Sequence, residues 1–153
     1  MQLEQPTRFE ILAGNQRDNS GMNNRQTVNT GTIWEDLAGY SRAVRVGNHI
    51  CVSGTTATDS SGALVGGTDP ALQMEFALKK VEAAIVSLGG QLTDIIRTRV
   101  YVHNMRDWEA VSRVHGRVFA KIRPANTLVQ SGLIGEGYLV EVDADALVDE
   151  QPK

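Results

Sequence analysis

Charged side chains alternate with apolar ones along two segments of the chain, and they are the first candidates for chemistry. One side of these segments carries Arg97, Arg99, Glu141, Asp143 and Asp145. A strand face that carries both positive and negative side chains is exposed to solvent, forms ion pairs between strands, or is covered by another subunit in an assembly. We favour an assembly, because Tyr101 and Leu139 share this face with the charges. Charged groups near a subunit junction would then line a small-molecule cleft.

The other reactive side chains give no metal or nucleophile pattern. The three histidines, His49, His103 and His115, lack the spacing of zinc ligands. His115 falls on the apolar side of a predicted helix, where a half-exposed core histidine is the usual case. Cys51, the only cysteine, is interpreted as a small buried hydrophobe rather than a reactive thiol. The stretch SSGALVGG is not followed by Gly-Lys-Ser/Thr and so predicts no phosphate loop. We expect neither a metal nor another cofactor.

The composition is that of one globular domain. The 153 residues are 41% hydrophobic and 22% charged, and chains of this length bury about two-thirds of their unfolded surface. A net charge of −3 without a Lys/Arg cluster argues against nucleic acid as a partner. No apolar run reaches about 18 residues, so no membrane span is expected. The N-terminus lacks the features of a secretory signal, and with a single cysteine we expect a cytoplasmic protein.

The N-terminal part of the chain differs from the rest. Residues 14–31 are rich in Asn, Gln, Ser and Gly and have almost no apolar periodicity, which predicts a loop or loose arm. Within the arm, residues 9–12 (FEIL) could form a short edge strand, and Met22 could be an alternative start. We therefore divide the chain into a polar arm, residues 1–33, and a single domain, residues 34–150.

The first half of the domain predicts a hairpin followed by a helix. SRAVRVGNHICVSG, residues 41–54, reads as two strands around the turn Gly47-Asn48. Asp69 can cap a helix whose first residue is Pro70. Apolar residues then recur at helical spacing until Gly89-Gly90 ends the run.

The second half predicts strand, helix, strand and strand. Residues 94–103 alternate, with Ile96, Thr98, Val100 and Val102 on one face. A second helix starts at Asp107, carries Trp108, Val111, His115, Val118 and Phe119 on one side, and ends at Arg123-Pro124. Residues 125–130 and 138–147 form the last strands. The order is β-β-α-β-α-β-β, and two helices can cover only one face of such a sheet.

From about Gly39 to Val148 the chain resembles the Rid family of YjgF-type proteins, whose best-studied members are RidA enamine/imine deaminases. The matching pieces are GYSRAVRVGN, HICVSGTTA, a helix ending in LGG, IIRTRVYVHNMRDWEAV, the RPA turn and VEVDADAL. Their order and spacing over roughly 110 residues carry the resemblance. It implies an α+β, chorismate-mutase-like subunit with one mixed sheet, assembled into a homotrimer. The sheets face an inner barrel, with a ligand cleft at each subunit junction.

The resemblance also assigns candidate site residues. Tyr40 falls where the family has a pocket tyrosine, and Ser53-Gly54 matches the strand whose backbone lines the cleft. Glu141 matches the acid thought to hold the attacking water. From the residues alone, Glu141 could equally be the partner of Arg97 or Arg99 in a cross-strand ion pair.

The chain departs from the family at two positions that bear on the ligand, and also at Ser112, where the family has an asparagine. The segment IRPANTLVQ reads Pro124-Ala125-Asn126 where RidA members have Pro-Ala-Arg, the arginine that clamps the carboxylate of a 2-imino acid. Asn126 is neutral and cannot form the bidentate ion pair, which should weaken carboxylate binding by roughly tenfold or more. Leu128 replaces a pocket cysteine, which argues for a more apolar ligand.

Three functions are compatible with this sequence. The first is a Rid-type deaminase or related hydrolase acting on an enamine, imine or similar electrophile other than a 2-imino acid. The second is a trimer that binds a metabolite without turning it over. The third is an endoribonuclease or translation inhibitor, a label the family has carried, which the acidic balance disfavours.

Overall fold

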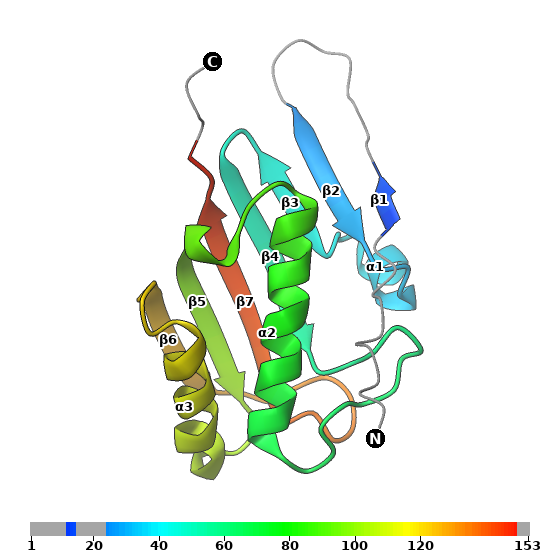
Figure 1. Cartoon of the computed structure of the whole chain (residues 1–153). Coiled ribbons are helices and arrows are strands. Elements are labelled where there is room, and N and C mark those ends of the chain that lie inside the picture. Colours follow the sequence, from blue (N-terminus) through cyan, green and yellow to red (C-terminus); the bar gives the residue numbers. More distant parts are fainter. Residues whose placement is uncertain (1–11, 15–23, 150–153) are drawn as a thin grey trace, which may run out of the picture.

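A single seven-stranded mixed sheet organises the chain (Figure 1). The computed structural model describes residues 12–14 and 24–149. Its strands are β1 (Leu12–Gly14), β2 (Arg25–Asn29), β3 (Ala43–Val46), β4 (His49–Thr56), β5 (Ile95–Val102), β6 (Ala125–Gln130) and β7 (Val140–Leu147). They lie in the order β1-β2-β3-β4-β7-β5-β6. Only β5 and β6 run parallel; every other neighbouring pair is antiparallel. The predicted α+β fold with one mixed sheet is confirmed.

Two long helices cover one face of the sheet, as predicted. They are α2 (Pro70–Ser87) and α3 (Trp108–Val118), which pack beside each other in front of β4, β7 and β5 (Figure 1). Between them and the sheet lies a core that includes Ile50, Val100 and Val142, all fully buried. The residues that alternate with Val142 along β7 therefore point to the open face. None of the helices in the described part of the chain is both long enough and apolar enough to span a bilayer.

Local signals account for α2 and for the first hairpin. The Asp69 carboxylate accepts hydrogen bonds from the backbone N–H groups of Ala71 and Leu72, at 2.9 and 3.2 Å. It thus satisfies donors that the first helical turn leaves without partners, and Pro70 occupies a position that needs no donor. The β3–β4 hairpin turns at Gly47-Asn48, where Gly47 has φ of 60°.

Part of the N-terminal arm is a strand, so the loop prediction for residues 14–31 is wrong at residues 25–29. Strand β2 pairs with β3, and its single apolar residue, Val28, is fully buried opposite Ala43. One buried valine leaves no periodicity to read, and the strand is held by backbone pairing. Of the predicted short strand at residues 9–12, only Leu12 is described; it begins β1 at the sheet edge, and the rest lies outside the described residues, as does Met22.

A short helix, α1 (Ile33–Ala38), follows β2 and was not predicted. Its buried Glu35 accepts hydrogen bonds from the backbone N–H and hydroxyl of Thr30 and from the N–H of Gly31. A carboxylate with several donors tolerates burial. Gly39 ends the helix at a φ of 66°, which suits glycine.

Two predicted details in the second half are wrong. Ile96 is 46% exposed and Ile95 is buried instead, because a register shift between Ile95 and Arg97 moves the side chains to the other face. Helix α3 ends at Val118 rather than at Arg123. The N–H of Arg123 bonds the carbonyl of Phe119, and Arg123 has φ of 53°, so the turn before Pro124 is no longer helical.

Candidate functional site

Tyr40, Ser53, Gly54 and Glu141 come together where β4 meets β7. Between Val52 and Thr55 strand β4 carries one residue more than β7 opposite, which is a β-bulge at Ser53-Gly54. Ser53 is held there, because its N–H donates to the Arg42 carbonyl at 2.9 Å and its hydroxyl donates to the Ser41 carbonyl at 2.7 Å. Bulges are common beside binding sites because they re-aim side chains.

The Glu141 carboxylate lies directly against Gly54. A Cβ atom at position 54 would collide with Glu141 Oε1, so only glycine leaves room for this carboxylate. Glu141 is half-buried on the open face, between Thr56 of β4 and Tyr101 of β5. Burial raises the pKa of Glu141; the charge of Arg42 acts in the opposite direction, and Asp143 adds to the rise. A carboxylate in this state is a stronger base than one in water.

Arg42 contacts three of the candidate site residues, and the sequence did not indicate it. Its buried guanidinium donates to the Gly54 carbonyl at 2.6 Å, to the Ser53 carbonyl at 3.3 Å and to the Thr55 hydroxyl at 2.9 Å. It also donates to the Tyr40 hydroxyl at 3.4 Å and lies 5.7 Å from the centre of that ring. Arg42 thus joins Tyr40 to the bulge. The available signal was a charged residue directly before the apolar start of β3, Ala43-Val44.

Lys80 is a second missed residue. From α2 its ammonium donates to the carbonyls of Thr56 and Thr58, at 2.9 and 2.8 Å, and so holds the chain where β4 ends. Burial, and then repulsion from Arg42, lower the pKa of Lys80 to about 8, with Asp59 opposing the shift. Helical periodicity gave no sign of it, because a lysine at this spacing reads as an exposed position.

Asn126 and Leu128 do not join this group. Both residues are on β6, and strands β7 and β5 lie between β6 and β4. At ordinary strand spacing, β6 is therefore roughly 14 Å from β4. They pair in register with Thr98 and Val100, which face the helices, whereas Glu141 is on the open face. Leu128 packs against the core and Asn126 is exposed. Within this chain the predicted site residues therefore form two separate groups.

The open face carries an ion-pair network that does not include Glu141. Arg99 Nη1 lies 2.8 Å from Asp143 Oδ1 and 3.2 Å from Asp145 Oδ2, and the Tyr101 hydroxyl donates to Asp143 at 3.0 Å. Among the described residues, no cation lies within ion-pair distance of Glu141. The reading of Glu141 as a cross-strand partner of Arg97 or Arg99 therefore fails in this subunit.

Two further candidates are placed by the structure. Cys51 is exposed on the open face, so its prediction as a buried hydrophobe is wrong; it alternates with the buried Ile50 and Val52 along β4. Partial burial and the nearby Asp145 raise the pKa of the Cys51 thiol, which disfavours a reactive thiolate. His115 bonds the Thr98 hydroxyl at 2.8 Å beneath the sheet, and burial lowers its pKa.

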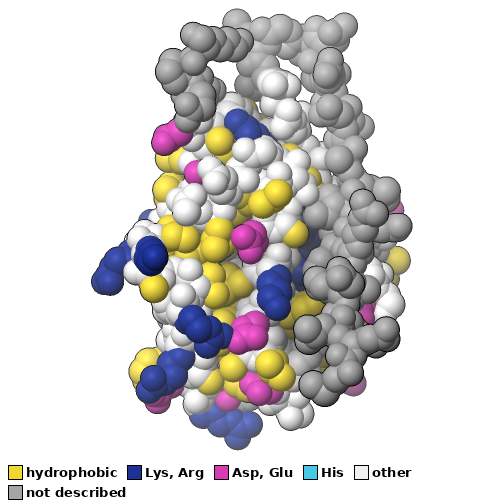
Figure 2. All heavy atoms as spheres, in the orientation of Figure 1, with side chains coloured by type: hydrophobic (Ala, Val, Ile, Leu, Met, Phe, Trp, Pro, Cys, Tyr) yellow, Lys and Arg dark blue, Asp and Glu magenta, His cyan; other side chains and the backbone are white. Residues whose placement is uncertain are grey.

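Surface charge gives no nucleic-acid footprint on the helix-covered face. Figure 2 shows Lys and Arg side chains on this face interspersed with Asp and Glu, without a continuous basic groove among the coloured residues. Two of the basic residues on α3 are paired with acids: Arg113 bonds Glu109, and Arg117 bonds Glu75 of α2.

Comparisons with known proteins agree with this architecture. The profile of the family described as "Endoribonuclease L-PSP" matches residues 32–148. The crystal structure of Rv2704 from Mycobacterium tuberculosis, described as a member of the YjgF/YER057c/UK114 family, is 42% identical, with a TM-score of 0.74 over 81% of this chain and 99% of that one.

Two of the curated relatives carry the names of deaminases. "3-Aminoacrylate deaminase RutC" from Acinetobacter baylyi is 30% identical over 73% of this chain and 89% of its own length. The human "2-iminobutanoate/2-iminopropanoate deaminase" is 28% identical over 80% of this chain and 90% of its own. The family match covers most of the domain, and its range includes Tyr40, Ser53-Gly54 and Glu141. The chain therefore belongs to the endoribonuclease L-PSP family, the YjgF-type or Rid family that its sequence resembles.

Proposed function

We propose that this protein holds a small electrophilic metabolite in a cleft between subunits and hydrolyses its C=N bond with water positioned by Glu141. The observation that carries this proposal is the placement of the Glu141 carboxylate. It is half-buried, has a raised pKa, makes no ion pair among the described residues, and lies against a glycine that a side chain would obstruct. The deaminase names of two relatives support the same reaction class.

The reaction needs little from the protein. Glu141 accepts a proton from water while the water oxygen bonds to the imine carbon, and the C=N electron pair moves to nitrogen. Glu141 then returns this proton to nitrogen, and the hydroxyl proton also passes to nitrogen as ammonia leaves and the carbon–oxygen double bond forms. The Tyr40 hydroxyl, held by Arg42, is available to orient the ligand. A positioned base of this kind contributes about 10²- to 10⁴-fold in rate.

A complete cleft requires a second copy of the chain. Asn126 and Leu128 are two strands away from Glu141 and face the other side of the sheet, so one ligand of metabolite size cannot contact both groups in one subunit. A homotrimer in which β6 of one copy approaches β4 and β7 of the next would join the two groups as half-sites of one cleft. Light scattering should report the trimer, and a monomer at working concentration would exclude this cleft.

Subunit complementation tests the shared site more directly. Glu141→Ala removes the base and Leu128→Arg blocks the other half-site, so each homotrimer should be inactive. Refolding the two variants together should restore part of the activity, because some junctions then combine two intact halves. No recovery from mixed trimers of demonstrated composition would show that the two groups do not share a ligand.

Asn126 sets the expected substrate class. Because it is neutral, we propose that 2-iminopropionate is a poor substrate and that neutral or more apolar imines and enamines are better ones. Ammonia release from imines made in situ would measure this. Asn126→Arg should improve 2-iminopropionate turnover by about tenfold or more. Thr127→Arg adds the same charge at the neighbouring exposed position, whose side chain faces the other way, and should give no gain.

A trimer that binds a metabolite without turnover is the second candidate, favoured by the neutral Asn126. Thermal-shift measurements with keto acids, neutral amides and aromatic acids would detect such a ligand. Stabilisation without ammonia release, unchanged in Glu141→Gln, would favour it over hydrolysis. The endoribonuclease function named in the family description is the third candidate. RNA cleavage that co-purifies with the protein and disappears in Glu141→Ala would support it.

A further inference from the structure

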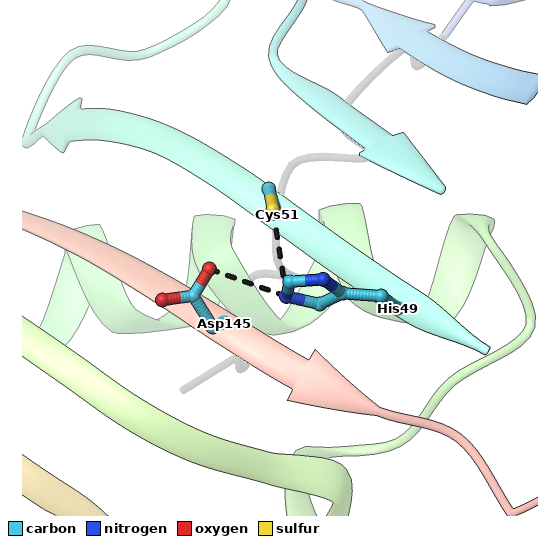
Figure 3. Close-up of side chains that lie close together, drawn as sticks. All are labelled: His49, Cys51 and Asp145. Atoms are coloured by element: carbon cyan, nitrogen blue, oxygen red, sulfur yellow. Dashed lines mark hydrogen bonds and ion pairs between the residues drawn. The ribbon is translucent and has the colours of Figure 1, made fainter. Parts of the chain in front are cut away.

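A second cluster of chemically active side chains lies on the open face, where β4 and β7 pair just before the bulge. His49 and Cys51 are two residues apart on β4 and so point to the same side, and Cys51 pairs in register with Asp145 of β7. Figure 3 shows the three side chains converging above these two strands. Asp145 is four residues from Glu141 along β7, roughly 13 Å, so the cluster does not include the proposed base, although Cys51 is only two residues from Ser53 on β4.

The three donor atoms lie close together. His49 Nε2 lies 3.6 Å from Cys51 Sγ and 3.5 Å from Asp145 Oδ1, and all three donors lie within 4.8 Å of one another. Both short distances involve the same ring nitrogen (Figure 3). In a nucleophilic triad the imidazole instead bridges its partners through its two different nitrogens. A single imidazole nitrogen carries either one proton or one lone pair. It therefore cannot accept a proton from the Cys51 thiol and at the same time donate a hydrogen bond to the Asp145 carboxylate.

We propose that His49, Cys51 and Asp145 bind a Zn²⁺ ion, with the fourth position open to water. Zinc takes thiolate, imidazole and carboxylate ligands in tetrahedral sites. With its usual bond lengths, neighbouring donors in a tetrahedron lie about 3.4 to 3.6 Å apart. The two short distances to the imidazole nitrogen therefore already fit, and Asp145 Oδ1, which lies within 4.8 Å of the sulfur, would move closer to it on binding.

The surroundings favour this ion and this carboxylate oxygen. Arg99 binds Asp145 through Oδ2, at 3.2 Å, which leaves Oδ1 directed toward His49 and holds the carboxylate in place. A thiolate and an imidazole select Zn²⁺ over Mg²⁺ or Ca²⁺, which prefer oxygen ligands. The thiol is exposed in the single chain. The spacing of the histidines could not predict this site, because two of its three donors are Cys51 and Asp145. Asp145 is also far from the other two donors in the sequence.

The single cysteine gives a direct test, independent of any catalytic activity. Full-length protein would be stripped of metal with a chelator and titrated with Zn²⁺ while the rate of Cys51 alkylation is measured. We expect saturation at one Zn²⁺ per chain, release of the thiol proton and a slower alkylation rate. Co²⁺ in place of Zn²⁺ should give a thiolate-to-metal charge-transfer absorption.

Variants separate this site from general surface binding. His49→Ala and Cys51→Ser should each weaken Zn²⁺ binding by about tenfold or more. His103→Ala removes another exposed histidine outside the cluster and should leave binding unchanged. Metal-free melting temperatures would establish that the variants fold. The proposal is overturned if stoichiometric Zn²⁺ leaves the alkylation rate unchanged, if the cobalt form has no charge-transfer absorption, or if His49→Ala binds zinc like the wild type.

Discussion

Replacing Gly54 with alanine would test the proposed role of Glu141 without altering any polar group. The backbone at Gly54 does not have a positive φ, so alanine is tolerated there conformationally. The added Cβ would occupy the place of Glu141 Oε1. The carboxylate must then retreat by roughly 1 Å, and a misplacement of that size can cost about 100-fold in rate.

The same substitution should have little effect on stability. The obstructed atom is the end of a flexible side chain at a half-buried position, so Glu141 can turn away. Holding it away from its preferred rotamer costs about 0.5–1.5 kcal/mol. Loss of activity with nearly normal stability would therefore identify a positional effect. Gly116→Ala is the matched control, because a Cβ there meets no atom within 4 Å in helix α3; it should leave activity intact and raise stability by about 0.5–1 kcal/mol.

Two measurements would check this reasoning. Ammonia release gives kcat/KM for Gly54→Ala, Gly116→Ala and the wild type. Titration of labelled Glu side chains by nuclear magnetic resonance follows Glu141 without requiring turnover. Burial raises the pKa of Glu141, so displacement toward water should lower it toward the ordinary value. Wild-type kcat/KM together with an unshifted Glu141 titration in Gly54→Ala would refute the argument.

Three further predictions concern stability, each checked by urea or thermal unfolding. Folding lowers the pKa of Lys80 from 10.5 to about 8. Between about pH 8 and pH 10.5 the unfolded state therefore binds more protons than the folded state. The free energy of unfolding should rise with pH across this range, by up to about 3 kcal/mol. Lys80→Met should remove that rise; an identical pH profile in the variant would contradict the assignment. Folding raises the pKa of Glu141. The free energy of unfolding should therefore fall as the pH rises from the ordinary pKa of glutamate through the pKa of Glu141 in the folded protein, because the side chain becomes charged over this range. Glu141→Gln should gain stability relative to the wild type over that window, and a constant difference between the two at every pH would exclude this effect. Asp69→Ala should lose about 1 kcal/mol with the N-cap of α2, whereas Asp69→Asn should retain most of it; equal losses would show that the charge of Asp69, rather than its cap hydrogen bonds, stabilises the helix.

Features encoded by neighbouring residues could be predicted from the sequence. The hairpin at Gly47-Asn48, the capped start of α2 at Asp69-Pro70 and the alternation along residues 140–147 are all present in the structure. Each depends on contacts within a few residues, which a window of sequence contains. The motif order likewise predicted the family, which the comparison over residues 32–148 confirms.

Details that depend on distant partners could not be predicted in this way. Strand β2 is fixed by pairing with β3, and the register shift at Ile96 by pairing with β7. Both are backbone arrangements that leave no periodic trace in the side chains. Arg42 and Lys80 are charged residues inside the fold, and burial of a charge is acceptable only where distant carbonyls accept its hydrogen bonds.

The sequence by itself determined which side chains are available and on which segments they lie. Only the tertiary structure decided which of them meet. It seats Glu141 against Gly54 but keeps Asn126 two strands away, and it brings Cys51 beside Asp145 although 94 residues separate them in the chain. The physical reason is that strand order and register, set by backbone pairing and the shared core, determine proximity across the sheet.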